Sequence, residues 1–198
     1  MVRKYEKGKR AVQEGATRQR IVEAAVELHE AIGGEATTVT AVADRAGVGR
    51  VTFYRHFPDE RSLLSACTGH YLDLNPPPDP TPWPAISDPI VRFRTALREL
   101  YAFYGRTEGM LARAEQESPT NPILAELMQP LLDYRCNIQE MLVQGWSRKH
   151  STDPVVRAAI GHALAFATWR SLVRQQGLEV DKAIALMLKL TADADESD

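Results

Sequence analysis

The sequence of 198 residues has no long apolar run and few cysteines, and each absence excludes a class of protein. The longest apolar stretches, such as 163–167 and 183–188, are far shorter than the roughly 18 to 20 residues of a membrane-spanning helix. The N-terminus is polar and charged through Arg20 and lacks the apolar core of a secretory signal, so we expect a cytoplasmic protein without a membrane partner. Cys67 and Cys136 are too few for a disulfide framework and have no metal-ligand spacing.

The signatures of common enzymes are also absent. The sequence has no Walker loop, no Gly-x-Ser-x-Gly motif and no His-Glu-x-x-His motif. Its five histidines include no pair at i and i+4 and no neighbouring cysteine. We therefore expect no catalytic residue, no metal and no cofactor. A helical enzyme is the least favoured of the functions considered.

The composition suits a globular core, because 44% of the residues are hydrophobic and 25% are charged. The net charge of -2 excludes a uniformly basic nucleic-acid coat, yet the charge is uneven along the chain. Residues 1–66 hold 11 Lys and Arg against 9 Asp and Glu, whereas the remainder holds 13 against 17. The first twenty residues alone balance at +5, which indicates a phosphate-binding arm or a solvated tail. Residues 1–16 show no apolar periodicity, so we predict that this basic arm is disordered.

Apolar periodicity predicts helices and no strand, so the predicted class is all-α with about nine helices. A first helix starts at Thr17 and ends at Gly33-Gly34, two short helices cover 38–46 and 50–56, and Asp59 caps a fourth. The proline-rich segment from Asn75 to Pro84 is a connector.

Three later helix starts share one signature, an N-cap residue followed by proline at the first helical position. They stand at Asp88-Pro89, Asn121-Pro122 and Asp153-Pro154 and predict helices over about 89–105, 122–148 and 154–175. A last helix is predicted over about 179–194. Pro130 should bend the second of these helices and open space against the helix at 89–105.

Residues 38–57, TVTAVADRAGVGRVTFYRHF, have the length and turn chemistry of a helix-turn-helix. Gly47 supplies a positive φ for the turn, and Phe53 and Phe57 are assigned to the core. The second helix has a high density of groups that contact bases and phosphates: Arg50, Thr52, Tyr54, Arg55 and His56. Arg50 suits guanine, Thr52 a thymine methyl or a phosphate, and the last three suit phosphates. A helical corner with a packed polar surface is the alternative that spacing leaves open.

Several short segments resemble the TetR-type (tetracycline-repressor-like) regulators. They are Thr38-Val39, Val42-Ala43, Ala46-Gly47-Val48, Thr52-Phe53-Tyr54-Arg55-His56-Phe57 and Leu63-Leu64. The resemblance is specific over about 17–66, and beyond Pro84 it rests on architecture and on the stretch WRSLVRQQGL from Trp169 to Leu178. It implies a three-helix DNA reader, a fourth connecting helix, a helical ligand-binding core and a homodimer formed by the last two long helices. It also implies a repressor that a small molecule releases from a palindromic double-stranded DNA operator.

The chain departs from the family pattern at three positions near the expected DNA surface. Gly49 stands where the family often has serine, Val51 where it often has glycine, and Glu60 where it usually has a phosphate-binding lysine. Arg61 and the basic arm are candidates to compensate for Glu60. The candidate DNA-binding residues are therefore Thr38, Thr40, Arg50, Val51, Thr52, Tyr54, Arg55 and His56. An interaction or scaffold protein of the same fold that has lost DNA binding is the alternative that Gly49 and Glu60 favour.

The predicted organisation is a basic arm over 1–16, a helix-turn-helix DNA-binding domain over 17–66 and a ligand-binding and dimerisation domain over 67–198. The third part is rich in aromatic and thioether side chains, which indicates an apolar or aromatic effector. The candidate ligand-binding residues are Tyr101, Tyr104, Met128, Tyr134, Asn137 and Met141. We expect a homodimer through the helices at about 154–175 and 179–194, with Ala159, Ala163 and Ala167 allowing close approach.

Overall fold

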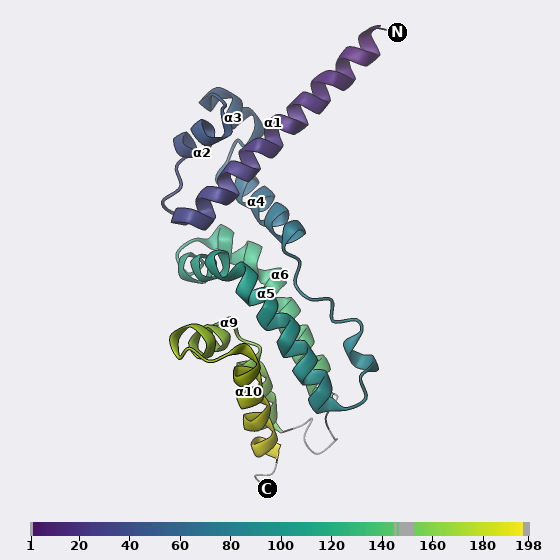
Figure 1. Ribbon diagram of the computed structural model, residues 1–198. Helices are drawn as coiled ribbons and strands as arrows, with labels where there is room; N and C mark the ends of the chain where they lie inside the picture. The colour runs from purple at the N-terminus through teal and green to yellow at the C-terminus, as the bar shows by residue number, and fades with distance from the viewer. Residues whose placement is uncertain (1, 145, 147–152, 196–198) are drawn as a thin grey trace. The chain divides into compact units, whose positions relative to one another are not determined.

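The computed structural model describes residues 2–144, 146 and 153–195 (Figure 1). Over this part of the chain it contains nine α-helices, a short 3-10 helix, η1 (Trp83–Ala85), a π-helical segment and no strand. This confirms the predicted all-α class. Within the same range, none of the helices combines the length and the apolar character that crossing a bilayer requires.

The chain forms two compact units. The first comprises the described residues up to Asn75 together with Glu108–Met128, and the second comprises Pro76–Thr107 together with the described residues from Gln129 onward. Helices α5 (Pro89–Glu117) and α6 (Pro122–Gln144) each run through both units. The predicted domain boundary after residue 66 stays a prediction, because compactness does not show which residues bind DNA.

Helix α1 (Val2–Ile32) begins well before the predicted start at Thr17. Thr17 lies inside it, and its hydroxyl donates to the carbonyl of Gln13 at 2.9 Å instead of capping the helix. The expectation of a disordered arm is therefore wrong for residues 2–16. The segment is rich in Lys, Arg, Glu, Gln and Ala, which favour helix formation without an apolar stripe.

Helices α2 (Val39–Ala46) and α3 (Arg50–His56) form the predicted helix-turn-helix. The Thr38 side chain caps α2 by accepting the amide of Ala41 at 3.1 Å. Gly47 follows with a φ of 65°, and the amide of Val48 donates to the carbonyl of Ala43 at 2.9 Å. These bonds turn the chain sharply between the two helices. As predicted, α3 contributes an apolar anchor to the core shared with α1 and α2, because Phe53 is 2% exposed.

Helix α4 (Glu60–Leu74) follows Phe57 after a short turn. As predicted, Asp59 caps it, and its carboxylate accepts the amide of Ser62 at 2.7 Å. Phe57 is buried, and the guanidinium of Arg18 lies 4.8 Å from the centre of its ring. Cys67 joins the same core as a free thiol, and burial raises the pKa of this thiol to about 12.

The long helices that follow the proline-rich connector differ in extent from the prediction. Helix α5 continues to Glu117 instead of ending near 105, and α6 ends at Gln144. Of the predicted residues 145–148, all but Trp146 lie outside the described residues. Helix α10 (Val180–Asp195) agrees with the predicted last helix. Pro130 is accommodated inside α6.

The single helix predicted over 154–175 is divided into α8 (Pro154–Ala163), α9 (Phe166–Trp169) and the π-helical segment η2 (Arg170–Gln175). The helix is interrupted at Ala165, whose backbone is extended. Two buried tyrosines of α5 use the carbonyls beside the break: Tyr101 donates to Ala163 at 3.0 Å and Tyr104 to Leu164 at 2.6 Å. Ala163 is itself buried within the chain, so it does not offer the close approach to a partner that we predicted.

The turn at Gly47 makes a quantitative prediction for stability. A Cβ there would have ordinary clearance, with Arg20 Nη1 at 3.9 Å, so the cost of Gly47→Ala is the left-handed backbone, about 1–2 kcal/mol of unfolding free energy. Gly69→Ala is the matched control, since Gly69 lies within α4 with open space around it and should gain about 0.5–1 kcal/mol. Urea unfolding measures both changes. Equal stability of the two variants would contradict the assignment of the turn.

Candidate nucleic-acid interface

Helix α3 presents most of its surface to solvent while one side chain holds it in place. Phe53 is its buried residue, whereas Val51 is 88% and Tyr54 46% exposed. Arg50 and Arg55 are exposed, and Thr52 is half-buried. The candidate residues of α3 thus lie on a surface that an external partner can reach.

The cationic groups of this surface are available to anions. Among the described residues, neither the Arg50 nor the Arg55 side chain forms a hydrogen bond or an ion pair. The Tyr54 ring packs edge-on against Phe53, with ring centroids 5.5 Å apart, which orients its hydroxyl-bearing edge without using the hydroxyl. Two free guanidiniums and a positioned phenol are suitable donors for phosphates and base edges.

The three remaining candidates differ in how accessible their polar atoms are. Thr40 is exposed, and Thr38 is exposed although its oxygen already accepts the amide of Ala41. The Thr38 hydroxyl can still donate its own hydrogen to a phosphate. His56 is half-buried, and its Nε2 is buried and finds no partner among the described residues. A contact from His56 to DNA would therefore use Nδ1.

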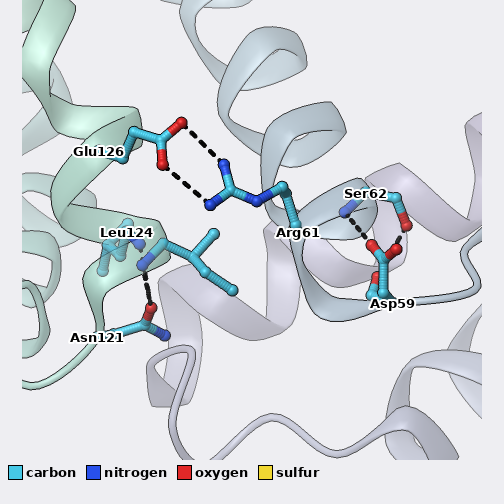
Figure 2. Close-up of polar contacts among 7 residues, drawn as sticks. Asp59, Arg61, Ser62, Asn121, Leu124 and Glu126 are labelled. Atoms are coloured by element: carbon cyan, nitrogen blue, oxygen red, sulfur yellow. Dashed lines mark hydrogen bonds and ion pairs between the residues drawn. The ribbon is translucent and has the colours of Figure 1, made fainter.

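The first turn of α4 is bonded to the start of α6 (Figure 2). Arg61 donates from its two terminal nitrogens to the two carboxylate oxygens of Glu126, at 2.8 and 2.9 Å. This hydrogen-bonded pairing raises the pKa of Arg61 and lowers the pKa of Glu126. Arg61, which we predicted to compensate for Glu60 at the DNA backbone, is thus already engaged within the chain.

Asn121 makes a second link between the same two helices. Its amide nitrogen donates to Glu60 at 2.9 Å. Its side-chain oxygen accepts the amide of Leu124 at 3.0 Å (Figure 2). The predicted N-cap of α6 therefore also holds the acidic side chain that departs from the family pattern. Sequence inspection did not find this link, because about 60 residues separate its partners.

The end of α5 is bonded to the end of α1. Arg113 donates to the carbonyls of Glu30 and Ala31, at 3.0 and 2.6 Å. Glu117 accepts the amide of Gly34 with both oxygens, at 3.0 and 3.1 Å. We call these two residues and the two partners of α4 the clasp: Arg113, Glu117, Asn121 and Glu126. The clasp joins residues 108–128 to the end of α1 and the start of α4 within the first compact unit.

The structure does not gather the six candidate ligand-binding residues at one described cavity. Tyr101 and Tyr104 use their hydroxyls on backbone carbonyls, and Tyr134 donates to the carbonyl of Pro78 at 2.8 Å. Burial raises the pKa of Tyr134 to about 12, so it remains protonated. Met128 belongs to the first unit, and the half-buried Met141 and the exposed Asn137 belong to the second. The ligand assignments stay predictions.

The sequence profile described as "Bacterial regulatory proteins, tetR family" matches residues 21–67. This range contains α2, α3 and all eight candidate DNA-binding residues. Residues 21–67 are therefore similar in sequence to this family. The TetR-family segment ends where the apolar core of the DNA reader ends, at Cys67. No curated protein matches the chain.

Solved structures of TetR-type regulators are similar to nearly the whole chain. A TetR-like transcriptional regulator from Rhodococcus sp. RHA1 is 18% identical, with a TM-score of 0.63 over 92% of this chain and 97% of that one. A Clostridium perfringens protein named as a candidate regulator of fatty acid metabolism is 18% identical, with a TM-score of 0.64 over 88% and 97%. A tetR-family transcriptional regulator from Streptomyces coelicolor is 15% identical, with a TM-score of 0.61 over 92% and 83%. The chain therefore shares the fold of these solved structures.

Proposed function

We propose that this protein is a transcriptional repressor that binds a palindromic operator as a homodimer and is released by a small apolar or aromatic effector. The observation that supports DNA reading best is the surface of α3, where Arg50, Tyr54 and Arg55 are exposed around a buried Phe53 anchor. In a dimer, two such helices would enter successive major grooves of the two half-sites.

The double variant Arg50→Ala/Tyr54→Ala tests the DNA reader. Each lost base or phosphate contact weakens binding by about 1–3 kcal/mol, so we expect operator affinity to fall more than about 100-fold. A DNA fragment selected from a random pool by the unmodified protein serves as the operator in a gel-shift titration. Folding should be unaffected, because both side chains are exposed.

The matched control is Arg94→Ala/Arg106→Ala, which removes two exposed arginines from the part of α5 in the second unit. It should leave operator affinity within about twofold at fixed salt. If the unmodified protein selects no DNA sequence, the interaction or scaffold alternative is favoured instead. If both double variants lost the same operator affinity, the loss would come from the change in net charge and not from contacts of α3.

The Arg61–Glu126 pair should compete with a DNA phosphate for the Arg61 guanidinium. The pair is weak in water, since its side chains are 52% and 62% exposed. Glu126→Gln should therefore free Arg61, raise operator affinity about two- to fivefold and steepen the salt dependence by about one phosphate contact per subunit. Gel shifts over a salt series measure both quantities.

Glu140→Gln provides the matched control for Glu126→Gln. Glu140 binds Arg157 in an equivalent two-bond pair, but both residues belong to the second unit. Its salt dependence should equal that of the unmodified protein. An unchanged slope in Glu126→Gln would show that Arg61 does not reach the DNA backbone.

The proposed dimer uses α8 and α10, which pack against each other in the second unit. Leu186 and Leu190 lie one helical turn apart on α10 and are 44% and 46% exposed in the single chain. Val155 of α8 is 57% exposed. Apolar side chains in this arrangement support an interface with a second copy.

Leu186→Asp/Leu190→Asp should convert the dimer to a monomer, because it would place four carboxylates in an apolar interface. Light scattering measures the mass, and circular dichroism checks that helicity is kept. Ile90→Asp/Val91→Asp is the control, since these two residues of α5 are 40% and 45% exposed and should leave the dimer intact. A monomeric unmodified protein would contradict the two-fold operator geometry.

The proposed effector would bind in the second unit, near its aromatic side chains. Tyr104, Phe166 and Trp169 contact one another, with ring centroids 5.3 to 6.0 Å apart. The indole nitrogen of Trp169 is buried and has no acceptor among the described residues. An apolar effector with one acceptor oxygen would supply the missing bond, which favours this region as its site.

A further inference from the structure

A groove of about 860 Å³ lies entirely within the first compact unit. Its lining comes from the ends of α1 and α5, from α2 and α3, and from the starts of α4 and α6. None of the six predicted ligand-binding residues lines it. The groove is therefore a site separate from the effector region proposed above, and its volume is within the range of small-molecule sites.

The chemistry of the lining combines apolar walls with negative charge. The apolar part includes Phe53, Phe57, Leu63, Leu64, Ile123 and Leu124. Four carboxylates line the same space: Glu35, Asp59, Glu60 and Glu117. Among the described residues that line the groove, none is a lysine or an arginine. Such a cleft concentrates cations, because its carboxylates reinforce one another beside low-dielectric walls.

The carboxylates keep acceptor capacity for a ligand. Glu60 accepts one bond from Asn121, and Asp59 accepts the amide of Ser62. A carboxylate has about four lone-pair positions, so each can accept a further donor. Arg61 follows Glu60 directly in the sequence, but it is not part of the lining, and Glu126 binds its guanidinium.

His29 provides an independent indication of a ligand. It is 8% exposed at the end of α1 and lines the groove. Within the described part of the chain, its imidazole forms no hydrogen bond. Burial lowers the pKa of His29, so the ring is neutral near pH 7 and has one donor and one acceptor nitrogen unused. The ring nitrogens are not among the fully buried unpartnered atoms of the described residues, so a ligand that enters the groove can reach them.

We propose that this groove binds a small amphipathic cation, an aromatic or branched alkyl group that carries a primary ammonium. The ammonium lies among the carboxylates and donates to the free nitrogen of His29. The apolar body packs on Phe53, Leu64 and Ile123. Anionic and uncharged molecules of the same shape bind less well, since they lack the attraction to four carboxylates.

A series of three isosteric probes tests the proposal without DNA. The probes are 1-naphthylmethylamine, 1-naphthylmethanol and 1-naphthoate, which differ in charge at one position. Nuclear magnetic resonance titration of the full chain should show millimolar binding of the amine, as suits a ligand of about twelve heavy atoms. The shifted amides should include Gly34, Leu64 and Ile123 of the lining. The alcohol should bind at least fivefold more weakly and the naphthoate should not bind.

Two matched double variants locate the charge effect. Glu35→Gln/Glu60→Gln removes two lining carboxylates and should weaken amine binding about five- to tenfold, with little change for the alcohol. Glu23→Gln/Asp73→Asn removes the same charge from exposed positions of α1 and α4 outside the lining and should leave amine binding unchanged. Equal binding of the three probes, shifts outside the groove, or equal effects of the two variants would overturn the proposal.

A second measurement rests on the proposed function. Since Thr38, Phe53 and Tyr54 of the DNA reader line the groove, saturating amine should change operator affinity at least threefold. The probe titration remains decisive for the site if the protein binds no DNA, so failure of the site and failure of the repressor proposal are distinguished. If the amine bound without any change in operator affinity, the groove would be a binding site, and the expected effect of the amine on DNA binding would be contradicted.

Discussion

The clasp bonds the α5–α6 region to the end of α1 and the start of α4. The arrangement of the helices around the helix-turn-helix depends on this constraint. Arg113 satisfies carbonyls at the end of α1, and Glu117 satisfies the amide of Gly34 just beyond it. Such terminal groups have no partner within their own helix, and leaving them unpaired would be costly. The compact unit that holds the reader therefore includes residues 108–128, although the sequence of the reader ends some forty residues earlier.

The first unit combines a closely packed apolar core with a weak attachment between α4 and α6. Its interior is an apolar core with Ile21, Val42 and Phe53 almost fully buried, and such packing resists small displacements. The Arg61–Glu126 attachment is instead an exposed ion pair, worth at most about 1 kcal/mol. Helix α6 continues from this attachment into the second unit, and α5 continues there from the bonds of Arg113 and Glu117. This continuity supports the proposal that an effector in the second unit influences the reader.

The sequence predicted features whose cause is local. Asp59 and Asp153 cap the helices that follow them, and Gly47 has the expected left-handed backbone, because each signal acts within four residues. The sequence did not predict the break at Ala165, since the stabilising hydroxyls of Tyr101 and Tyr104 come from about sixty residues away. The clasp and the groove depend on equally remote partners. The helical start of α1 was missed because its residues favour a helix by composition and show no apolar period.

The unusual acid at the start of α4 changes where positive charge for DNA must come from. Glu60 replaces a phosphate-binding lysine and is held by Asn121, while Glu126 holds Arg61. Two arginines of α1 lie near the reader instead. Arg18 stacks on Phe57 at the end of α3, and Arg20 Nη1 is 3.9 Å from the place of a Cβ on Gly47, at the turn. Since α1 is a continuous helix from Val2, it holds these arginines beside both ends of α3. In the proposed DNA complex, α1 would thus supply the phosphate contacts that the family pattern assigns to α4.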